Sequence, residues 1–376
     1  MSDPPAITIP PDLLPSDGRF GSGPSRIRPE AVAALAEVGT TYLGTSHRKA
    51  TVRDVVGRLR DGLSELFGLP DGWEIVLGNG GTTVFWDAAT FGLIDERSQH
   101  LSFGEFSSKF AAAAAAAPHI GDPEVIESPV GTHPQPRPTD DVDLYALTHN
   151  ETSTGVSMGL ARPSGANPDA IVAVDATSAA GGLRWDPAEV DVYYFAPQKC
   201  LASDGGLWLA ACSPAAIERI ERISASGRWV PASIDLKIAL DNSRQNQTYN
   251  TPALATVFLA MHHVEWCNSH GGLEWAAGRC DESARIIYGW AEASAHATPF
   301  VADPAHRSHV VATIDLDDAV EADTVNAVLR ANGIVDTDSY RKLGRNQLRI
   351  ALFPATDPAD VAALTACIDH VVASLG

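Results

Sequence analysis

The segment FAPQKCLASDGG carries a lysine, at position 199, shortly after a short apolar segment. One carboxylate, Asp175, follows another apolar segment, AIVAV, at the distance expected of a neighbouring strand. Taken alone, Lys199 can be a solvated strand end and Asp175 a helix N-cap or the partner of an arginine. A third feature, the glycine pair before Thr82, precedes a helical segment, where free N–H groups and the helix dipole favour phosphate.

Together, these three features are the parts that a pyridoxal phosphate site needs. A lysine forms the Schiff base, a carboxylate pairs with the pyridinium nitrogen, and a glycine loop holds the phosphate. The loop is neither G-x-G-x-x-G nor a Walker sequence, so no dinucleotide or nucleoside triphosphate site is predicted. Lys199 needs a lowered pKa to act as nucleophile and base, which burial beside a cationic cofactor would supply. The sequence therefore predicts pyridoxal 5'-phosphate as cofactor.

Apolar runs and helical stretches alternate between residues 31 and 255, which predicts an α/β fold with a mostly parallel sheet. Ligands of such sheets bind beyond the carboxyl ends of the strands, so the polar residues after each strand should converge. The last strand follows its predecessor so closely that we expect it to return antiparallel. Predicted strands lie within 74–81, 144–155, 170–181, 191–199 and 206–213.

The chain has 376 residues, which exceeds one typical core and predicts more than one domain. Residues 1–30 are rich in Pro, Gly and Ser and predict an extended N-terminal arm. Residues 31–255 form the predicted large, cofactor-binding domain. Residues 256–376 show a shorter alternation of helices and strands and predict a smaller C-terminal α/β domain.

Composition limits the partners and the compartment. The formal net charge of −20 argues against nucleic acid and anionic membrane as partners. Five cysteines without a C-x-x-C pair favour a reducing compartment, and the lone C-x-x-H of Cys267 and His270 has no second ligand pair, so no metal site is predicted. We see no secretory segment at the N-terminus and no apolar run approaching transmembrane length. These features predict a soluble, cytoplasmic protein.

Several motifs carry a family resemblance. Their order along the chain, from about residue 20 to the end, resembles that of the phosphoserine aminotransferases, which belong to the class V group of fold-type I pyridoxal phosphate enzymes. The motifs are SHR (46–48), GG (80–81), HNETSTG (149–155), VDATS (174–178), FAPQK (195–199) and YNTPA (249–253).

The resemblance implies a fold and a reaction. The large domain should hold a mostly parallel, seven-stranded type of sheet flanked by helices. The reaction should transfer the amino group of L-glutamate to 3-phosphohydroxypyruvate, giving O-phospho-L-serine and 2-oxoglutarate in serine biosynthesis. The same site is suited to 3-hydroxy-2-oxo-4-phosphobutanoate, of pyridoxine biosynthesis, and the sequence does not rank the two acceptors.

The resemblance also implies roles for individual residues around the cofactor. Lys199 would form the Schiff base and move the proton, Asp175 would pair with the ring nitrogen, and Thr154 would hydrogen-bond the ring hydroxyl. Phe106 is the candidate for the stacked ring, where the family usually has a tryptophan. The phosphate would be bound by Gly81, Thr82 and Gln198, and by Asn250 and Thr251 of the partner subunit in a homodimer with shared active sites.

Substrate binding requires two anion sites. Arg349, in NQLRIAL, offers a fork for the α-carboxylate, although alone it also fits a surface strand arginine. His47 and Arg48 resemble the family's phosphate-side pair, contributed across the dimer, and Lys342 would assist. The segment SYRKLGRNQ departs from the commoner pattern and leaves Arg341, Lys342 and Arg345 unranked. The usual loop arginine after the double glycine is replaced by Thr82-Thr83.

Three other functions remain open from the sequence. An alanine–glyoxylate aminotransferase of class V would have little use for a cationic phosphate pocket. A cysteine desulfurase needs a mobile nucleophilic cysteine, and Cys200, on the next pleat after Lys199, should face away from the site. A non-enzymatic, cofactor-binding regulator would carry a basic or DNA-binding segment, and none is visible.

Overall fold

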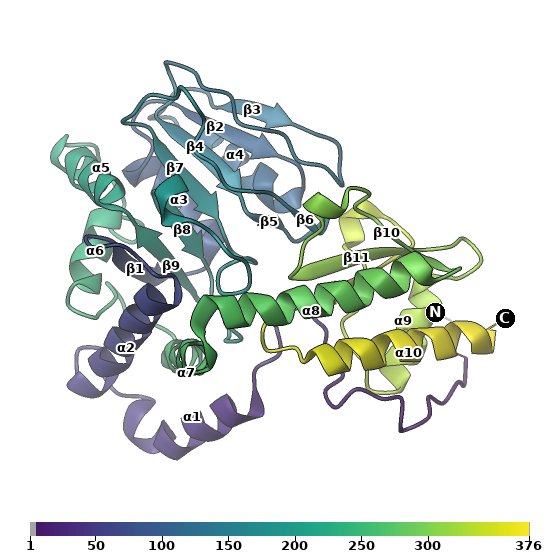
Figure 1. Ribbon diagram of the computed structural model, residues 1–376. Coiled ribbons are helices and arrows are strands. Elements are labelled where there is room, and N and C mark those ends of the chain that lie inside the picture. The colour runs from purple at the N-terminus through teal and green to yellow at the C-terminus, as the bar shows by residue number, and fades with distance from the viewer. Residues whose placement is uncertain (1–4, 376) are drawn as a thin grey trace.

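A seven-stranded sheet forms the centre of the larger lobe, in the order β1-β9-β8-β7-β4-β2-β3. The structure is a computed structural model that describes residues 5–375, and Figure 1 shows the sheet with helices on both of its faces. The strands are β1 Glu74–Asn79, β2 Ser98–Ser102, β3 Glu124–Glu127, β4 Leu144–Thr148, β7 Ile171–Asp175, β8 Val192–Phe195 and β9 Leu207–Cys212.

All strands of this sheet run in one direction except β9, which is antiparallel to both β1 and β8. The predicted α/β fold with a mixed seven-stranded sheet, including the antiparallel return after Lys199, is confirmed. Because β1, β4, β7 and β8 are parallel, their carboxyl ends meet at one edge of the sheet.

Alternate residues of the strands pack on opposite faces of the sheet. In β1, Ile75 and Leu77 join one core, whereas Val76 joins the other. Helices α2 and α7 cover the first face, and α3, α4, α5 and α6 cover the second. The helices of this lobe are α1 Pro29–Tyr42, α2 Ala50–Leu66, α3 Thr82–Gly92, α4 Glu105–Ala116, α5 Pro214–Ala225, α6 Leu236–Ser243 and α7 Leu254–His270.

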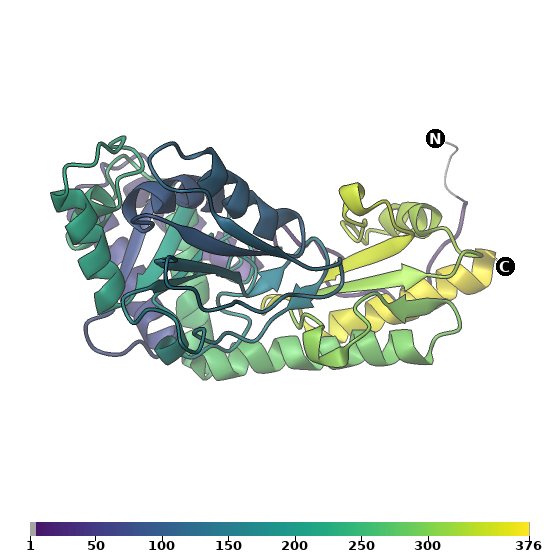
Figure 2. The ribbon, with the colours of Figure 1, turned by 90° about the horizontal axis from the view of Figure 1, so that it is seen from above.

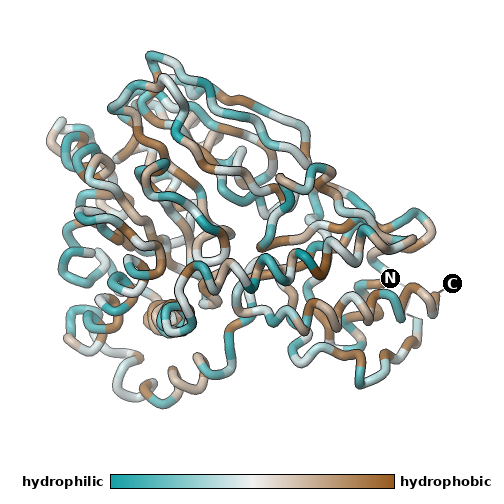
Figure 3. The backbone as a smooth tube through the Cα atoms, viewed as in Figure 1, coloured by the Kyte–Doolittle hydropathy of each residue, from teal (hydrophilic) through white to brown (hydrophobic). Residues whose placement is uncertain are grey.

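The smaller lobe is built on a three-stranded antiparallel sheet, β10 (Ala297–Pro299), β11 (Val311–Leu316) and β12 (Gln347–Ala351). Helices α9 (Ala322–Ala331) and α10 (Pro358–Leu375) cover it. Figure 2 shows the two lobes side by side, with one long helix running along both. Hydrophobic residues follow the strands inside each lobe, and the outer loops are largely hydrophilic (Figure 3).

That long helix is α8 (Gly272–Ala293), and it belongs to both cores. Cys280 packs in the core of the large sheet, whereas Ile287 packs in the core of the small lobe. Phe20 of the arm also packs in the small core. The division into an arm, a large domain and a small domain stays a prediction. These cores favour a boundary within α8 rather than at residue 256.

Helix α10 has the length and mean hydropathy of a membrane span, alone among the helices of residues 5–375. The expectation that no apolar run approaches this length was therefore wrong. Half of the helix is buried, and it packs against α8 and α9. A core helix meets the same criterion, and this burial accounts for the hydropathy of α10.

Candidate active site

The polar residues that end the parallel strands lie side by side at the carboxyl edge of the sheet. Thr148 of β4 stands opposite Asp175 of β7, which in turn stands opposite Tyr194 of β8. The turn after β8 carries Lys199. The small lobe contacts this edge, where the Thr313 hydroxyl of β11 donates to the Thr154 carbonyl at 2.9 Å.

Lys199 is buried, with 8% of its surface exposed. Its Nζ donates to the Ser22 carbonyl of the N-terminal arm at 2.6 Å. The arm passes so close that a Cβ on Gly23 would lie 2.4 Å from Nζ, so a side chain there would displace the lysine. Burial, with the nearby charge of Arg349, lowers the pKa of Lys199 to about 8. An amine in this environment is ready for nucleophilic and proton-transfer chemistry near neutral pH.

Asp175 is buried at the end of β7, and the Thr177 N–H donates to its Oδ1 at 2.9 Å. Burial raises its pKa to about 6, although the hydrogen bonds from Thr177 oppose this. No ion pair joins Asp175 to a cation among residues 5–375. A buried carboxylate without a cation is unfavourable, and a cationic ligand group beside Asp175 would relieve that cost.

The first turn of α3 provides an anion site beside Asp175. Gly81 is its N-cap and has open space around the position of a Cβ, and Thr82 is the first helical residue. The Thr177 hydroxyl donates to the Thr82 hydroxyl at 2.8 Å, which joins this turn to the loop after β7. Free N–H groups at a helix start and two hydroxyls suit a phosphate.

Several buried polar atoms at this edge have no hydrogen-bond partner within the described chain. Buried polar groups are nearly always paired, so unpaired groups that converge on one place indicate a bound polar ligand. The convergence around Lys199 fits pyridoxal phosphate with a bound substrate, because the ring hydroxyl would partner Thr154 Oγ1 and the substrate carboxylate would accept from Arg349 Nε. The atoms are Ser22 Oγ, Thr154 Oγ1, Gln198 Oε1 and Arg349 Nε.

Phe106 lies in the first turn of α4, and its ring centre is 5.8 Å from Lys199 Nζ. The ring centre of Tyr340 lies a further 6.0 Å from that of Phe106. The structure therefore places the residue expected to stack on the cofactor beside the lysine. Tyr340, from the small lobe, was not singled out from the sequence.

Arg349, on β12, lines a cavity of about 950 Å³ with residues 21–24 of the arm and residues 338–342. Its guanidinium lies 5.3 Å from the centre of the Tyr340 ring. Burial lowers the pKa of Arg349, partly offset by Tyr340 and Asp338. A partly desolvated guanidinium beside Lys199 suits a carboxylate ligand.

The residues expected to act across a dimer form a separate group. His47 Nδ1 lies 3.0 Å from the Thr251 hydroxyl, and Asn79 donates to the Thr251 carbonyl at 3.2 Å. Arg48 and Asn250 are exposed. Burial and Arg48 lower the pKa of His47. Within the part of the chain that the structure describes, no hydrogen bond or ion pair joins this group to Lys199.

The three cationic residues of the segment 341–345 make different contacts. Lys342 pairs with Glu105 of α4 at 2.5 Å, which ties the small lobe to the large one. Arg345 pairs with Asp315, which leaves it committed within the small lobe. Arg341 and Lys342 line the same cavity as Arg349. Of the three, Arg341 and Lys342 therefore share a cavity with Arg349, and Arg345 does not line it.

Cys200 is buried, and its Sγ donates to the Ser178 carbonyl at 3.2 Å. Burial raises the pKa of Cys200 well above its usual value. The expectation that it faces away on the next pleat of a strand was wrong in its reason, because β8 ends at Phe195 and the cysteine lies in a turn. Its burial still leaves no mobile thiolate of the kind that a desulfurase requires.

A family model described as aminotransferase class-V matches residues 20–337. The chain belongs to the class-V aminotransferases. Phosphoserine aminotransferases of Nocardioides sp. and Rhodococcus jostii are 62% and 59% identical over 368 residues, each covering 98% of both chains. The resemblance to phosphoserine aminotransferases is therefore confirmed.

A solved structure, a phosphoserine aminotransferase of Cytophaga hutchinsonii, is similar to this class-V aminotransferase with a TM-score of 0.87. The two are 24% identical, and the match covers 95% of this chain and 99% of the other. At this identity the likeness shows the fold alone.

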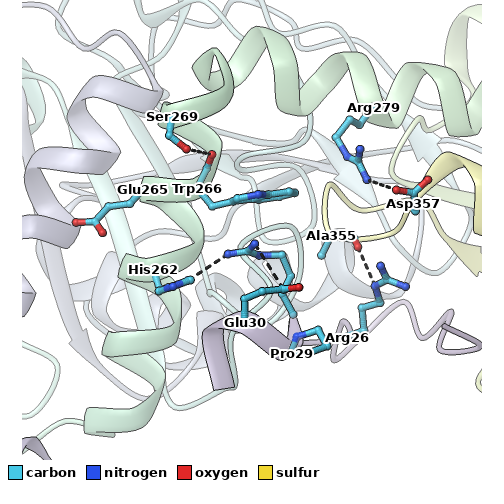
Figure 4. A pocket seen from close by; sticks show the side chains of 11 residues that line it. Arg26, Pro29, Glu30, His262, Glu265, Trp266, Ser269, Arg279, Ala355 and Asp357 are labelled. Atoms are coloured by element: carbon cyan, nitrogen blue, oxygen red, sulfur yellow. Dashed lines mark hydrogen bonds and ion pairs between the residues drawn. The ribbon is translucent and has the colours of Figure 1, made fainter. Parts of the chain in front are cut away.

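A second cavity of this class-V aminotransferase, of about 750 Å³, lies between α7, α8 and the arm (Figure 4). Arg28 stacks 4.1 Å from the centre of the Trp266 ring. Arg26 donates to the Ala355 carbonyl, and Arg279 pairs with Asp357. Two of the three arginines that line this cavity thus bind the loop after β12. The cavity therefore lies where the two lobes are held together.

Sequence reasoning missed the contribution of the arm and of Glu151. The arm holds Lys199 through Ser22, and the Ser25 N–H donates to the Gln198 carbonyl at 2.7 Å. Glu151 is completely buried beside Phe106. The small and flexible residues of the GSGPS segment were the available signal for the arm, since a close approach of backbone to a ligand site favours glycine.

Proposed function

We propose that this protein transfers the amino group of L-glutamate to 3-phosphohydroxypyruvate, giving O-phospho-L-serine and 2-oxoglutarate, with pyridoxal phosphate as cofactor. The observation that carries the proposal is the buried Lys199, which lies beside the Asp175 carboxylate, an open helix start and a set of unpaired polar atoms. The choice of reaction is supported by relatives 58–62% identical over nearly the whole chain that are named for it.

The residues at the carboxyl edge fit this cofactor. When bound, pyridoxal phosphate supplies an electron sink for the substrate's Cα–H bond. We infer that Lys199 holds the cofactor covalently, that Asp175 pairs with the ring nitrogen, and that Thr154 donates to the ring hydroxyl. Phe106 covers a ring face. Gly81, Thr82 and Gln198 bind the phosphate, Gln198 through the NH2 group of its amide, and the free N–H groups that open α3 support this.

Lys199 moves the proton in this proposal. A buried amine with a pKa of about 8 can release a proton at neutral pH and take one back, because its charged and neutral forms are close in free energy. The Ser22 carbonyl orients the amine through the 2.6 Å hydrogen bond. The arm and the small lobe exclude water from the lysine, since only 8% of its surface is exposed.

The substrate ends are bound by cations on two elements. We propose that Arg349 binds the α-carboxylate, supported by its unpaired Nε and its place beside Lys199. Lys342 assists at the mouth of the cavity, where it pairs with Glu105. His47 and Arg48 bind the substrate phosphate. Cationic side chains at both ends of the site favour an acceptor with two anionic groups.

The site is completed by a second copy of the chain. We propose a homodimer in which His47, Arg48, Asn250 and Thr251 of one subunit reach the cofactor and substrate phosphates of the other. The exposed side chains of Leu43 and Tyr249 next to this group support a contact surface there. Mixed dimers of Lys199→Ala and Arg48→Ala subunits test this. They should regain activity that neither variant has alone, whereas sites confined to one subunit predict no recovery.

We also propose a cytoplasmic location and the three-part division of the chain. All five cysteines are free and buried, which suits a reducing compartment. The separate small-lobe core supports a C-terminal domain that packs against the large one.

A spectrum of the purified protein tests the reaction. The visible band of the bound cofactor should disappear on addition of L-glutamate and return with 3-phosphohydroxypyruvate. A matched titration with 3-hydroxy-2-oxo-4-phosphobutanoate measures the second acceptor, and glyoxylate serves as the unphosphorylated control. A band that returns with glyoxylate as readily as with the phosphorylated acceptors would refute the proposed substrate class.

A further inference from the structure

Glu151 is a completely buried carboxylate without a cationic partner within residues 5–375. It lies in β5 (Asn150–Glu151), just beyond the carboxyl end of β4. Ionised carboxylates are seldom buried unless hydrogen bonds replace their water. The groups that donate hydrogen bonds to Glu151 therefore indicate its role.

Both carboxylate oxygens accept two hydrogen bonds. Oε2 accepts from the backbone N–H groups of Phe106 and Ser107 at 3.0 and 2.8 Å. Oε1 accepts from the Ser153 N–H at 3.1 Å and from its hydroxyl at 2.7 Å. The same hydroxyl accepts from the Glu105 N–H at 3.1 Å. Three consecutive N–H groups at the start of α4 are thus bound by one acid and its neighbouring serine.

Helix α4 has no N-cap side chain next to it in the sequence. Its N-cap residue is Gly104, which has no side chain to accept these hydrogen bonds. A Cβ on Gly104 would lie 2.3 Å from Glu151 Cγ, so the glycine leaves room for the acid. The position of α4 along this edge is therefore set by a residue 45 positions away in the sequence. The negative charge at the helix start is also favoured by the helix dipole.

One of the residues that Glu151 binds lies beside the lysine. Phe106 donates its N–H to Glu151, and its ring centre lies 5.8 Å from Lys199 Nζ. The backbone carbonyl of Glu151 accepts from the N–H groups of Thr154 and Gly155 at 3.2 and 2.9 Å. One residue thereby links the ring and the hydroxyl that are proposed to contact the cofactor.

We propose that Glu151 is a positioning residue that holds the Phe106 ring against the cofactor. The inference rests on the proposed function, because it requires a bound pyridine ring for Phe106 to cover. Glu151 has no hydrogen bond or ion pair with Lys199 within the described residues and does not line the substrate cavity, so its contacts reach the site through the backbone of α4. Its charge also opposes the lowering of the Lys199 pKa by burial. A role in folding alone would use the same hydrogen bonds, and the two roles differ in whether the effect of Glu151 depends on the Phe106 ring.

A double-mutant cycle on cofactor binding separates these roles. Apoprotein is prepared as wild type, Glu151→Gln, Phe106→Leu and the double variant, and equilibrium dialysis measures pyridoxal phosphate affinity. The amide of Gln keeps one acceptor but turns the other into a donor facing N–H groups. Loss of the stacked ring in Phe106→Leu should weaken binding about 3- to 10-fold. Glu151→Gln should weaken it by about 3-fold or more alone, and by less than about 2-fold when Phe106 is already leucine.

Asp191→Asn is the matched control. Asp191 is also a buried carboxylate that accepts a backbone N–H, from Val172 at 2.8 Å, but it pairs with Arg162 and lies at the amino end of β8. Its replacement should lower the melting temperature and leave cofactor affinity within about 2-fold of wild type. Ser153→Ala removes one of the two links to α4 and takes the place of Glu151→Gln in the cycle if that variant does not fold.

The outcomes distinguish the inference from the function on which it rests. Equal weakening by Glu151→Gln in both backgrounds overturns the positioning role, even when wild type binds the cofactor. A wild-type protein that binds no pyridoxal phosphate overturns the proposed function and this inference together. Weakening that vanishes in the Phe106→Leu background supports the positioning role.

Discussion

The two ends of the central sheet both bury charged and polar side chains, but they treat them differently. At the amino end, the Asp143 carboxylate accepts from the N–H groups of residues 95–97 and pairs with Arg219 at 2.9 Å. Arg219 also donates to the carbonyls of Leu93 and Asp169. This cluster is satisfied by the chain itself.

At the carboxyl end, comparable burial leaves partners missing. Thr154 Oγ1, Gln198 Oε1 and Arg349 Nε are buried and unpaired within the described residues, and burial lowers the pKa of Lys199 to about 8. Polar groups that the chain satisfies stabilise the fold, whereas groups left unsatisfied cost stability and are retained for a ligand. The comparison predicts that changes at the amino end affect stability, and that changes at the carboxyl end affect catalysis.

The largest effect is expected at Lys199. Lys199→Ala should lower transamination by about 10⁴-fold or more, because it removes both the nucleophile and the proton carrier. The apoprotein should stay folded, since the variant also removes a buried amine whose charged form is disfavoured. Single-turnover kinetics with L-glutamate measures the first effect and urea unfolding the second. Normal turnover by this variant would contradict the mechanism.

A change at Arg219, at the amino end, should affect stability and not catalysis. Arg219→Met removes a buried guanidinium from its ion pair with the half-buried Asp143 and should lower the free energy of unfolding by about 3 kcal/mol, because Asp143 and two carbonyls lose their donor. The kcat of the folded enzyme should stay near that of wild type. Urea unfolding and steady-state kinetics on the same preparation check both. A loss of kcat without a loss of stability would remove the distinction between the two ends.

The sequence predicted this carboxyl end because its signals are local. A charged or hydroxyl residue at or soon after the end of an apolar strand marks the strand end, and parallel strands bring such ends together. Asp175, Thr154 and Lys199 were found in this way, and their places at one edge follow from the sheet order. Their chemical roles remain proposals.

The contacts that were missed join segments far apart in the chain. Nothing near Lys199 indicates that the carbonyl of Ser22 will meet its amine, and nothing near Phe106 indicates that Glu151 will cap its helix. Such pairings follow from how the lobes and loops pack, which periodicity does not encode. Helix α10 is a similar case, because hydropathy alone cannot separate a core helix from a membrane helix.

The pH dependence of stability should show whether Asp175 has a cationic partner. Burial raises its pKa from 3.8 to about 6, so the folded apoprotein holds this proton more tightly than the unfolded chain. The contribution of Asp175 to stability should therefore fall as pH rises from about 4 to 6, by about 3 kcal/mol, and stay low above that. Asp175→Asn apoprotein should lack this loss and be the more stable of the two at pH 7.

Binding of the cofactor should reverse that order. A pyridinium nitrogen beside Asp175 favours the carboxylate, so wild type should gain more stability from pyridoxal phosphate than Asp175→Asn does. Melting temperatures with and without cofactor, from pH 4 to 8, check both statements. Parallel curves for the two proteins would mean that Asp175 meets no cation in the holoenzyme.

Arg349 tests the substrate side of the same end. Arg349→Lys should raise the KM for L-glutamate about 10- to 100-fold, because an ammonium cannot form the two parallel hydrogen bonds of a guanidinium fork. Arg345→Lys is the matched control, since Arg345 is committed to Asp315 in the small lobe. Its KM should stay within about 2-fold of wild type. Similar changes in both variants would place the carboxylate site elsewhere.

Cys200 should give the smallest effect, although it is the immediate neighbour of the lysine. Its Sγ points to the Ser178 carbonyl, and burial keeps its pKa too high for a thiolate. Cys200→Ala should therefore change kcat/KM by less than about 2-fold, because only a weak hydrogen bond and some packing are lost. A large loss of activity would show that proximity to Lys199 matters more than burial. Sulfide release from L-cysteine by wild type, abolished in Cys200→Ala, would favour a desulfurase instead.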